Sequence, residues 1–149
     1  MLIRRLKKED IVPLVNIGAL MHKQGSFKKI RYDKDKLFQV ALSSINSNDK
    51  AWFVAEDEDG YIGMMGGFIG TFYFSHEKFA ADYLIYIPEN KRGGKAAIKL
   101  LNAFEEWAKE KGVSEIRVGT ANGTKPKAVR KFYEWRKYDF IGYLLRKEL

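Results

Sequence analysis

Residues 84–101 place an apolar segment, a loop of glycine and basic residues, and an amphipathic segment in direct succession. The apolar segment reads L-I-Y-I-P, the loop E-N-K-R-G-G-K, and the amphipathic segment A-A-I-K-L-L. This order predicts a strand, a loop and a helix. The first turn of a helix has N–H groups without intrahelical partners and a partial positive charge, and both favour an anion. Gly93 and Gly94 let the backbone approach a ligand closely. The segment therefore predicts a site for a phosphate-bearing molecule.

Basic side chains around the glycines strengthen this interpretation without deciding it. Lys91, Arg92 and Lys95 supply full positive charges beside the expected helix start. A glycine-rich turn that precedes a helix, with its charges in solvent, is an equal alternative when the loop is taken by itself.

Hydrophobic periodicity along the chain predicts alternating strands and helices. Strands are expected at residues 2–6, 51–56, 61–73, 79–87, 114–120 and 140–147. Helices are expected from residues 9–10 to about 23, from the capping residue Asp33 to about 45, at 94–111, and from Thr124 and Pro126 onward. Strands 79–87 and 114–120 flank one helix, so they are expected to be parallel. Glycines that interrupt strand 61–73 indicate a bulge or a close backbone approach, namely Gly63, Gly66, Gly67 and Gly70.

Composition narrows the classes of function. The 149 residues, of which 46% are apolar, suit one domain with a packed core. The absence of cysteine excludes disulfides, thiolate metal sites and a cysteine nucleophile, and no metal site is expected. No apolar run approaches membrane-spanning length, and residues 1–10 do not resemble a signal peptide, so a cytoplasmic protein is expected. The net charge of +8 is compatible with an anionic small ligand, nucleic acid or an acidic membrane.

The loop Lys91-Arg92-Gly93-Gly94-Lys95-Ala96 resembles the Q/R-x-x-G-x-G/A loop of the GCN5-related N-acetyltransferases, the GNAT family. The preceding Pro88 also matches, and the expected order β-α-α-β-β-β-α-β-α-β is similar to that family over nearly the whole chain. The resemblance implies one α/β (α+β) domain over residues 1–149. It also implies a mixed, mostly antiparallel sheet with a splayed parallel pair, flanked by about four helices. Segments R-G-G-K-A-A and G-T-A-N-G-T look most like small acetyltransferase-like proteins of tailed phages.

The same resemblance implies acetyl-CoA as co-substrate and assigns residues to it. Backbone groups of Leu84 and Tyr86 would pair with the pantetheine arm, where the strand splays from its parallel neighbour. The N–H groups of Arg92 to Ala96 would bind the pyrophosphate. Asn122 would contact the cofactor from the end of a strand, because Pro126 occupies the position of a frequent cofactor-binding Asn. The simpler alternative for Leu84 and Tyr86 is an ordinary place in the sheet.

A tyrosine on the last helix often serves the family as general acid toward the leaving thiolate. The family pattern Y-E-x-x-G-F is similar to the run from Tyr133 to Tyr138, which assigns this role to Tyr133. Lys137 departs from the pattern, because Gly is usual there. The alternative for Tyr133 is a buried core side chain.

The general base is assigned to a carboxylate on the central strands. Asp82 is expected on the same face as Leu84 and Tyr86 because side chains alternate along a strand. Glu56, at the end of another strand, is the other candidate, and each is equally compatible with a plain surface acid. His22 is expected near a helix C-terminus in a capping role, and His76 in an exposed turn.

Two functions remain in competition at this stage. The first is an acetyl-CoA-dependent N-acetyltransferase acting on an unidentified amine, as a monomer or homodimer and without a membrane partner. The second is a catalytically inactive GNAT-fold protein that binds an anionic partner such as nucleic acid, or acts within a larger assembly. The second draws on the basic residues of the last helix, namely Lys125, Lys127, Arg130, Lys131, Arg136 and Lys137. Nothing in the sequence names the acceptor.

Overall fold

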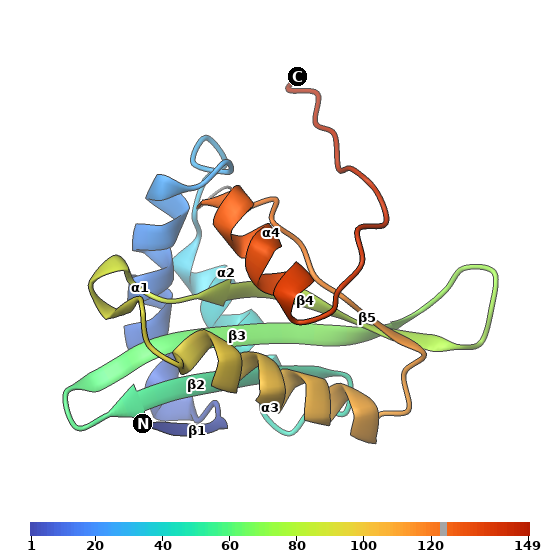
Figure 1. Ribbon diagram of the computed structural model, residues 1–149. Helices are drawn as coiled ribbons and strands as arrows, with labels where there is room; N and C mark the ends of the chain where they lie inside the picture. Colours follow the sequence, from blue (N-terminus) through green and yellow to red (C-terminus); the bar gives the residue numbers. More distant parts are fainter. Residues whose placement is uncertain (123–124) are drawn as a thin grey trace.

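The computed structural model describes residues 1–122 and 125–149 and contains one mixed sheet (Figure 1). The strand order follows the sequence: β1 (Leu2–Arg5), β2 (Lys50–Asp57), β3 (Gly60–Thr71), β4 (Lys78–Tyr86) and β5 (Glu115–Arg117). Neighbouring strands are antiparallel from β1 to β4, whereas β4 and β5 are parallel. The predicted parallel pair and the mostly antiparallel sheet are therefore confirmed.

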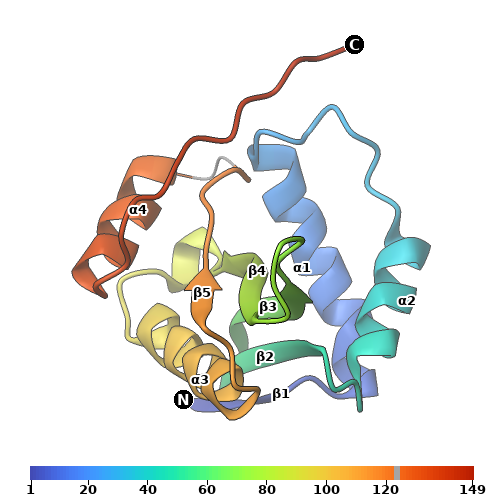
Figure 2. The same cartoon turned by 90° about the vertical axis from the view of Figure 1, so that its right-hand side faces the viewer.

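Helices cover both faces of this sheet, as Figure 2 shows. One face carries α1 (Ile11–Gln24) and α2 (Lys34–Ser44), and the opposite face carries α3 (Ala96–Glu110) and α4 (Pro126–Trp135). Short 3-10 turns, η1 (Lys8–Asp10) and η2 (Glu89–Lys91), precede α1 and α3. Two apolar clusters result, one on each face of the sheet. None of the described helices is long and apolar enough to cross a membrane.

Local sequence signals explain the positions of these helices. The predicted apolar stripe of α3 is buried against the sheet at Leu100, Leu101, Phe104, Trp107 and Ala108. Asp33 caps α2 as expected, because its carboxylate accepts the Lys36 N–H at 2.9 Å. The predicted start of the last helix at Thr124 lies outside the described residues.

A bulge interrupts the pairing of β3 with β4, as the glycines of β3 indicated. Gly66 pairs with Leu84 but Gly67 pairs with Asp82, so Tyr83 is an extra residue on β4. The extra residue shifts the alternation of side chains by one position. Leu84 and Tyr86 pack in the cluster beneath α1, whereas Asp82 lies on the opposite face beside α4. The prediction that Asp82 shares a face with Leu84 and Tyr86 is therefore wrong.

The predicted strand at 140–147 is also wrong. Residues 138–149 form no strand, and the large apolar side chains from Phe140 onward are exposed, with Ile141 at 78% and Leu145 at 89%. A strand needs a backbone partner, and β5, the last strand of the sheet, is only three residues long. The apolar pattern of this segment predicts a strand, but a local pattern does not show whether the sheet has a free edge with which that strand could pair.

Candidate active site

The parallel strands β4 and β5 separate after a short paired stretch. Their register joins Phe79–Ala81 to Glu115–Arg117 and stops there, while β4 continues to Tyr86 beside β3. From Asp82 to Tyr86 the backbone of β4 therefore has no strand partner on its β5 side within the described chain. This is the splay that the family resemblance implies, and we call the divergence of the two backbones beyond Ala81 and Arg117 the gap between β4 and β5.

The loop between β4 and α3 holds unused backbone donors at the end of this gap. Gly93 has a φ of 92°, a conformation that glycine adopts without strain. In the described chain no acceptor is recorded for the N–H groups from Gly93 to Ala96. A Cβ added at Gly93 or Gly94 would meet no atom within 4 Å. Both glycines therefore border open space, with backbone donors beside it.

Arg92 has a different place from the one that sequence reasoning assigned to it. Its N–H donates to the Glu89 carbonyl at 3.3 Å, and its Nε donates to the Ile87 carbonyl at 2.9 Å. These bonds fold the side chain back on the end of β4. Arg92 therefore stabilises the start of the loop, and its guanidinium group lies beside the Ile87 carbonyl. Lys95 is the exposed N-cap of α3, and Lys91 is half-buried at the end of η2.

The N-terminus of α4 lies near this loop. Lys125, which precedes α4, has its Nζ 3.5 Å from Glu89 Oε1 of η2. This ion pair brings the start of α4 beside η2, which precedes the loop.

Tyr133 is buried on the α3 and α4 face of the sheet. Its side chain is 4% exposed, and within the described chain its phenol oxygen has no hydrogen-bond partner. Burial, followed by the negative charge of Asp82, raises the pKa of Tyr133 far above its usual range. The phenol therefore keeps its proton at any working pH, which suits a hydrogen-bond donor.

Asp82 lies at the point where β4 and β5 separate. Its Oδ1 accepts the Gly119 N–H at 3.1 Å, from the segment that follows β5. Burial raises the pKa of Asp82 to about 6, although this hydrogen bond lowers it in part. A carboxyl group with a pKa near neutrality can accept a proton under ordinary conditions.

Other predicted residues fall outside this group. The carbonyl of Asn122 accepts the Ser26 N–H at 2.7 Å, which ties the segment after β5 to the loop after α1. Glu56 is bonded through both carboxylate oxygens to Arg4, at 2.8 Å each, so it belongs to an ion-pair cluster at β1 and β2. His22 makes a contact of 2.6 Å with the Ile30 carbonyl in the loop after α1.

Sequence reasoning missed the part played by Gly119. Its N–H holds the Asp82 carboxylate, but a backbone donor leaves no side-chain signal. Gly119, near the end of the expected strand 114–120 and first in the G-T-A-N-G-T segment, is the trace that the sequence offers.

Comparison with known proteins decides the family. A sequence model of the acetyltransferase (GNAT) family matches residues 19–140. The chain belongs to this family. It is therefore an N-acetyltransferase of the GNAT family, and acetyl-CoA is the acetyl donor that this family uses. No curated protein matches the sequence.

Solved structures share the fold of this GNAT protein along its whole length. AAC(6')-Iy in complex with the bisubstrate analog CoA-S-monomethyl-acetylneamine is 15% identical, with a TM-score of 0.76 and coverage of 99% of this chain and 96% of that chain. The aminoglycoside acetyltransferase meta-AAC0020 from an uncultured soil metagenomic sample, in complex with sisomicin, is 20% identical, with a TM-score of 0.72 and coverage of 99% and 94%. A ribosomal-protein-alanine N-acetyltransferase from Brucella melitensis is 17% identical, with a TM-score of 0.70 and coverage of 99% and 100%. Because these names specify different acceptors, the fold leaves the acceptor of this chain open.

Proposed function

We propose that the chain transfers the acetyl group of acetyl-CoA to a primary amine at the gap between β4 and β5. The observation that carries the proposal is the set of N–H groups from Gly93 to Ala96, which have no recorded acceptor and border open space where this gap ends. Donors of this kind at the N-terminus of α3 suit the pyrophosphate of coenzyme A. Lys91, Lys95 and the partly engaged Arg92 add positive charge. The unpaired backbone of β4, at Leu84 and Tyr86, suits the pantetheine arm.

Tyr133 and Asp82 supply the proton transfers in this proposal. The Tyr133 phenol donates its proton to the thiolate that leaves when the C–S bond breaks. The Asp82 carboxylate accepts the proton that the amine releases as the new C–N bond forms. The raised pKa of Asp82 suits a base, because the carboxyl group titrates near neutrality. The raised pKa of Tyr133 keeps the phenol protonated, so it can donate a hydrogen bond to the developing thiolate, although the shift itself opposes release of the proton.

The inactive, anion-binding alternative is less well supported. Three cations near or on α4 are engaged in ion pairs: Lys125 with Glu89, Arg130 with Glu134, and Arg136 with Glu105. These pairs reduce the positive charge that a nucleic acid would meet on this helix.

Two measurements with the intact chain test the proposal. Acetyl-CoA should raise the melting temperature, because a ligand that binds only the native state stabilises it. A thiol reagent should then detect coenzyme A release when suitable amines are added. A chain that shows neither protection nor amine-dependent release is not an acetyl-CoA-dependent transferase. A chain that instead retains polynucleotide, with strong salt dependence, supports the binding alternative.

A further inference from the structure

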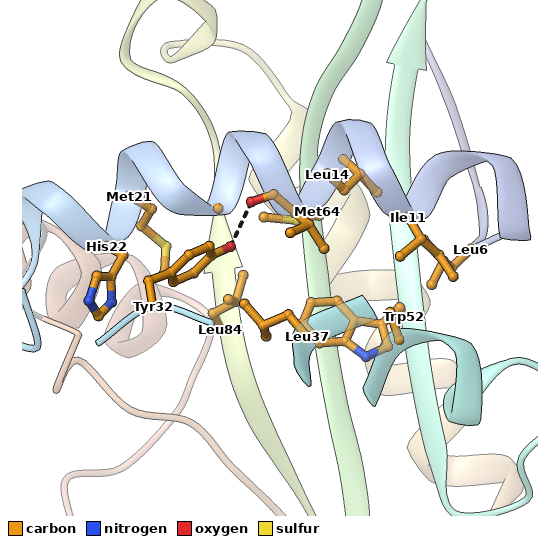
Figure 3. A pocket seen from close by; sticks show the side chains of 13 residues that line it. Leu6, Ile11, Leu14, Met21, His22, Tyr32, Leu37, Trp52, Met64 and Leu84 are labelled. Atoms are coloured by element: carbon orange, nitrogen blue, oxygen red, sulfur yellow. Dashed lines mark hydrogen bonds between the residues drawn. The ribbon is translucent and has the colours of Figure 1, made fainter. Parts of the chain in front are cut away.

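An apolar cavity lies between α1, α2 and the sheet, on the face opposite Tyr133 (Figure 3). Its volume is about 100 Å³. Aliphatic and aromatic side chains from both helices and from β2, β3 and β4 line it, including Leu14, Met21, Leu37, Trp52, Met64 and Leu84. An apolar cavity of roughly 150 Å³ accepts benzene. A branched alkyl group therefore suits the size of this one.

Tyr32 and His22 on the cavity wall are engaged with backbone carbonyls, whereas the indole N–H of Trp52 is buried, uncharged and without a partner in the described chain. Tyr32 donates its hydroxyl to the Val15 carbonyl at 2.6 Å, as the dashed line in Figure 3 shows. His22 contacts the Ile30 carbonyl through its Nε2. Among the described residues that line the cavity, none is acidic. A ligand group that enters meets apolar surface and no carboxylate to neutralise a cation.

The surroundings of the cavity also disfavour a cationic ligand. The loop that follows α1 carries Lys28, Lys29 and Arg31, all exposed, beside Tyr32. Two acids lie at this loop and both are engaged: the Asp33 carboxylate caps α2 through the Lys36 N–H, and Glu148 pairs with Lys29 at 3.1 Å. The whole chain has a net charge of +8. A ligand with several positive charges would be repelled on approach.

Position links the cavity to the proposed reaction. Leu84 lines the cavity and belongs to the part of β4 that has lost its β5 partner. The loop after α1, at the Tyr32 end of the cavity, is tied to the segment after β5 through the Ser26 N–H and the Asn122 carbonyl. The cavity thus adjoins the gap from the face opposite Tyr133 and Asp82.

We infer that the acceptor is a primary amine with an apolar side chain and no second positive charge. Its apolar group occupies the cavity while its amino group reaches the gap beside Leu84. This inference rests on the proposed function and narrows its acceptor class. It also separates this chain from transferases of polycationic acceptors, because an ammonium group placed in the cavity would lose its hydration without gaining a carboxylate.

A matched pair of amines tests the acceptor class. Isopentylamine and 1,4-diaminobutane have similar lengths, but one ends in two methyl groups and the other in an ammonium group. With acetyl-CoA present, kcat/KM should be about tenfold or more higher for isopentylamine. Isopentylamine should also raise the melting temperature of the coenzyme A complex. Preference for 1,4-diaminobutane or an aminoglycoside, or no binding of isopentylamine, would overturn the inference.

Two leucine substitutions on α2 locate the effect. Ala41 lines the cavity, whereas Ser43 is exposed on the same helix. Ala41→Leu should fill part of the cavity and lower kcat/KM for isopentylamine about fivefold or more, and kcat/KM for ethylamine, which is too short to fill the cavity, should fall much less. Ser43→Leu should change neither value. Equal losses for both amines in Ala41→Leu would contradict the assignment.

The two proposals fail in different ways. If acetyl-CoA does not raise the melting temperature, the proposed function is wrong. If acetyl-CoA raises the melting temperature but cationic amines are the better acceptors, only the inferred acceptor class is wrong.

Discussion

The phenol of Tyr133 on α4 and the carboxyl group of Asp82 on β4 lie on the same face of the sheet, beside the point where β4 and β5 separate. They are close enough for the charge of Asp82 to raise the pKa of the phenol, yet no hydrogen bond saturates the phenol oxygen within the described chain. A buried donor without a partner carries a free-energy cost. That cost is understandable if the phenol is kept free for a substrate atom.

Tyr133→Phe removes this donor and keeps the ring. Turnover should fall by on the order of 100-fold, while the dissociation constant for acetyl-CoA stays nearly constant, because in the proposed reaction the donor acts on the leaving thiolate. Steady-state kinetics and calorimetry measure the two quantities. Tyr138→Phe is the control, since Tyr138 donates to Glu105 at 3.0 Å and packs against the Tyr133 ring. Equal rates in Tyr133→Phe and the unmodified chain would remove Tyr133 from the reaction.

Asp82→Asn should stabilise the fold at neutral pH. The folded pKa of about 6 lies above the ordinary value of 3.8, so the folded state holds this proton more tightly than the unfolded state. Stability therefore falls as pH rises from about 4 to about 6 and stays lower above that range. Asparagine removes this loss and should raise the free energy of unfolding by on the order of 2 kcal/mol at pH 7, with no gain near pH 3. Urea unfolding of both proteins at pH 7 and pH 3 measures this gain in stability. An equal gain at both pH values would show that the buried charge of Asp82 is not the cause.

The same substitution should lower activity. In the unmodified chain, kcat/KM should rise with pH through about 6 as Asp82 ionises. Asp82→Asn should lose this rise together with most of the turnover. A pH–rate profile that keeps the rise in Asp82→Asn would assign the base to another group.

Asp10→Asn should weaken the fold most at neutral pH. Arg4 donates to both carboxylate oxygens of Asp10, at 2.7 and 2.9 Å, and Tyr61 donates at 2.8 Å. The bonds from Arg4 are the main reason that the pKa of Asp10 falls to about 2. A lowered folded pKa contributes stability above about pH 4, and this contribution is lost as pH falls toward 2.

The substitution should therefore cost about 3 kcal/mol at pH 7 and less near pH 2, as measured by chemical unfolding. Glu106→Gln is the control, because the pair of Glu106 with Lys109 is exposed, and it should have little effect. A cost for Asp10→Asn that is equally large at pH 2 would contradict the role of its charge.

Lys137→Gly should stabilise the chain. Lys137 has a φ of 70° at the end of α4, where its N–H donates to the Glu134 carbonyl at 2.9 Å and the Tyr138 N–H donates to the Tyr133 carbonyl at 3.0 Å. This is a Schellman ending, whose left-handed position favours glycine. The gain should be about 1 kcal/mol in unfolding experiments. Lys131→Gly, inside α4, should instead cost about 1 kcal/mol, and a loss in both variants would contradict the strain at Lys137.

Features carried by local patterns could be predicted from the sequence. The α3 stripe, the Asp33 cap and the glycine-marked irregularity in β3 each depend on residues close in the chain. The parallel pair followed from the helix between its strands. The glycines and charges of residues 91–96 indicated the loop that we propose for the phosphates, and this assignment stays a prediction. The phage-type resemblance and the single-domain interpretation stay predictions.

Features that depend on residues distant in the sequence could not be predicted from local sequence patterns. The glycines indicated an irregularity, but they did not show that the extra residue, Tyr83, would fall on β4 and turn Asp82 to the other face. The segment at 140–147 alternates like a strand, but whether a strand forms depends on a free edge elsewhere. Arg92 bonds to the Ile87 carbonyl, whereas its charge and position suggested a role toward the ligand alone.

Calorimetric titration of acetyl-CoA into Gly94→Trp tests the central claim most directly. Both Gly94 and Gly142 border open space, so tryptophan should fold at either position without a clash, and Gly142→Trp serves as the control. The indole at position 94 should fill the space in front of the free N–H groups and abolish measurable acetyl-CoA binding, whereas Gly142→Trp should bind like the unmodified chain. Unchanged affinity in a folded Gly94→Trp would show that acetyl-CoA is not held at this loop.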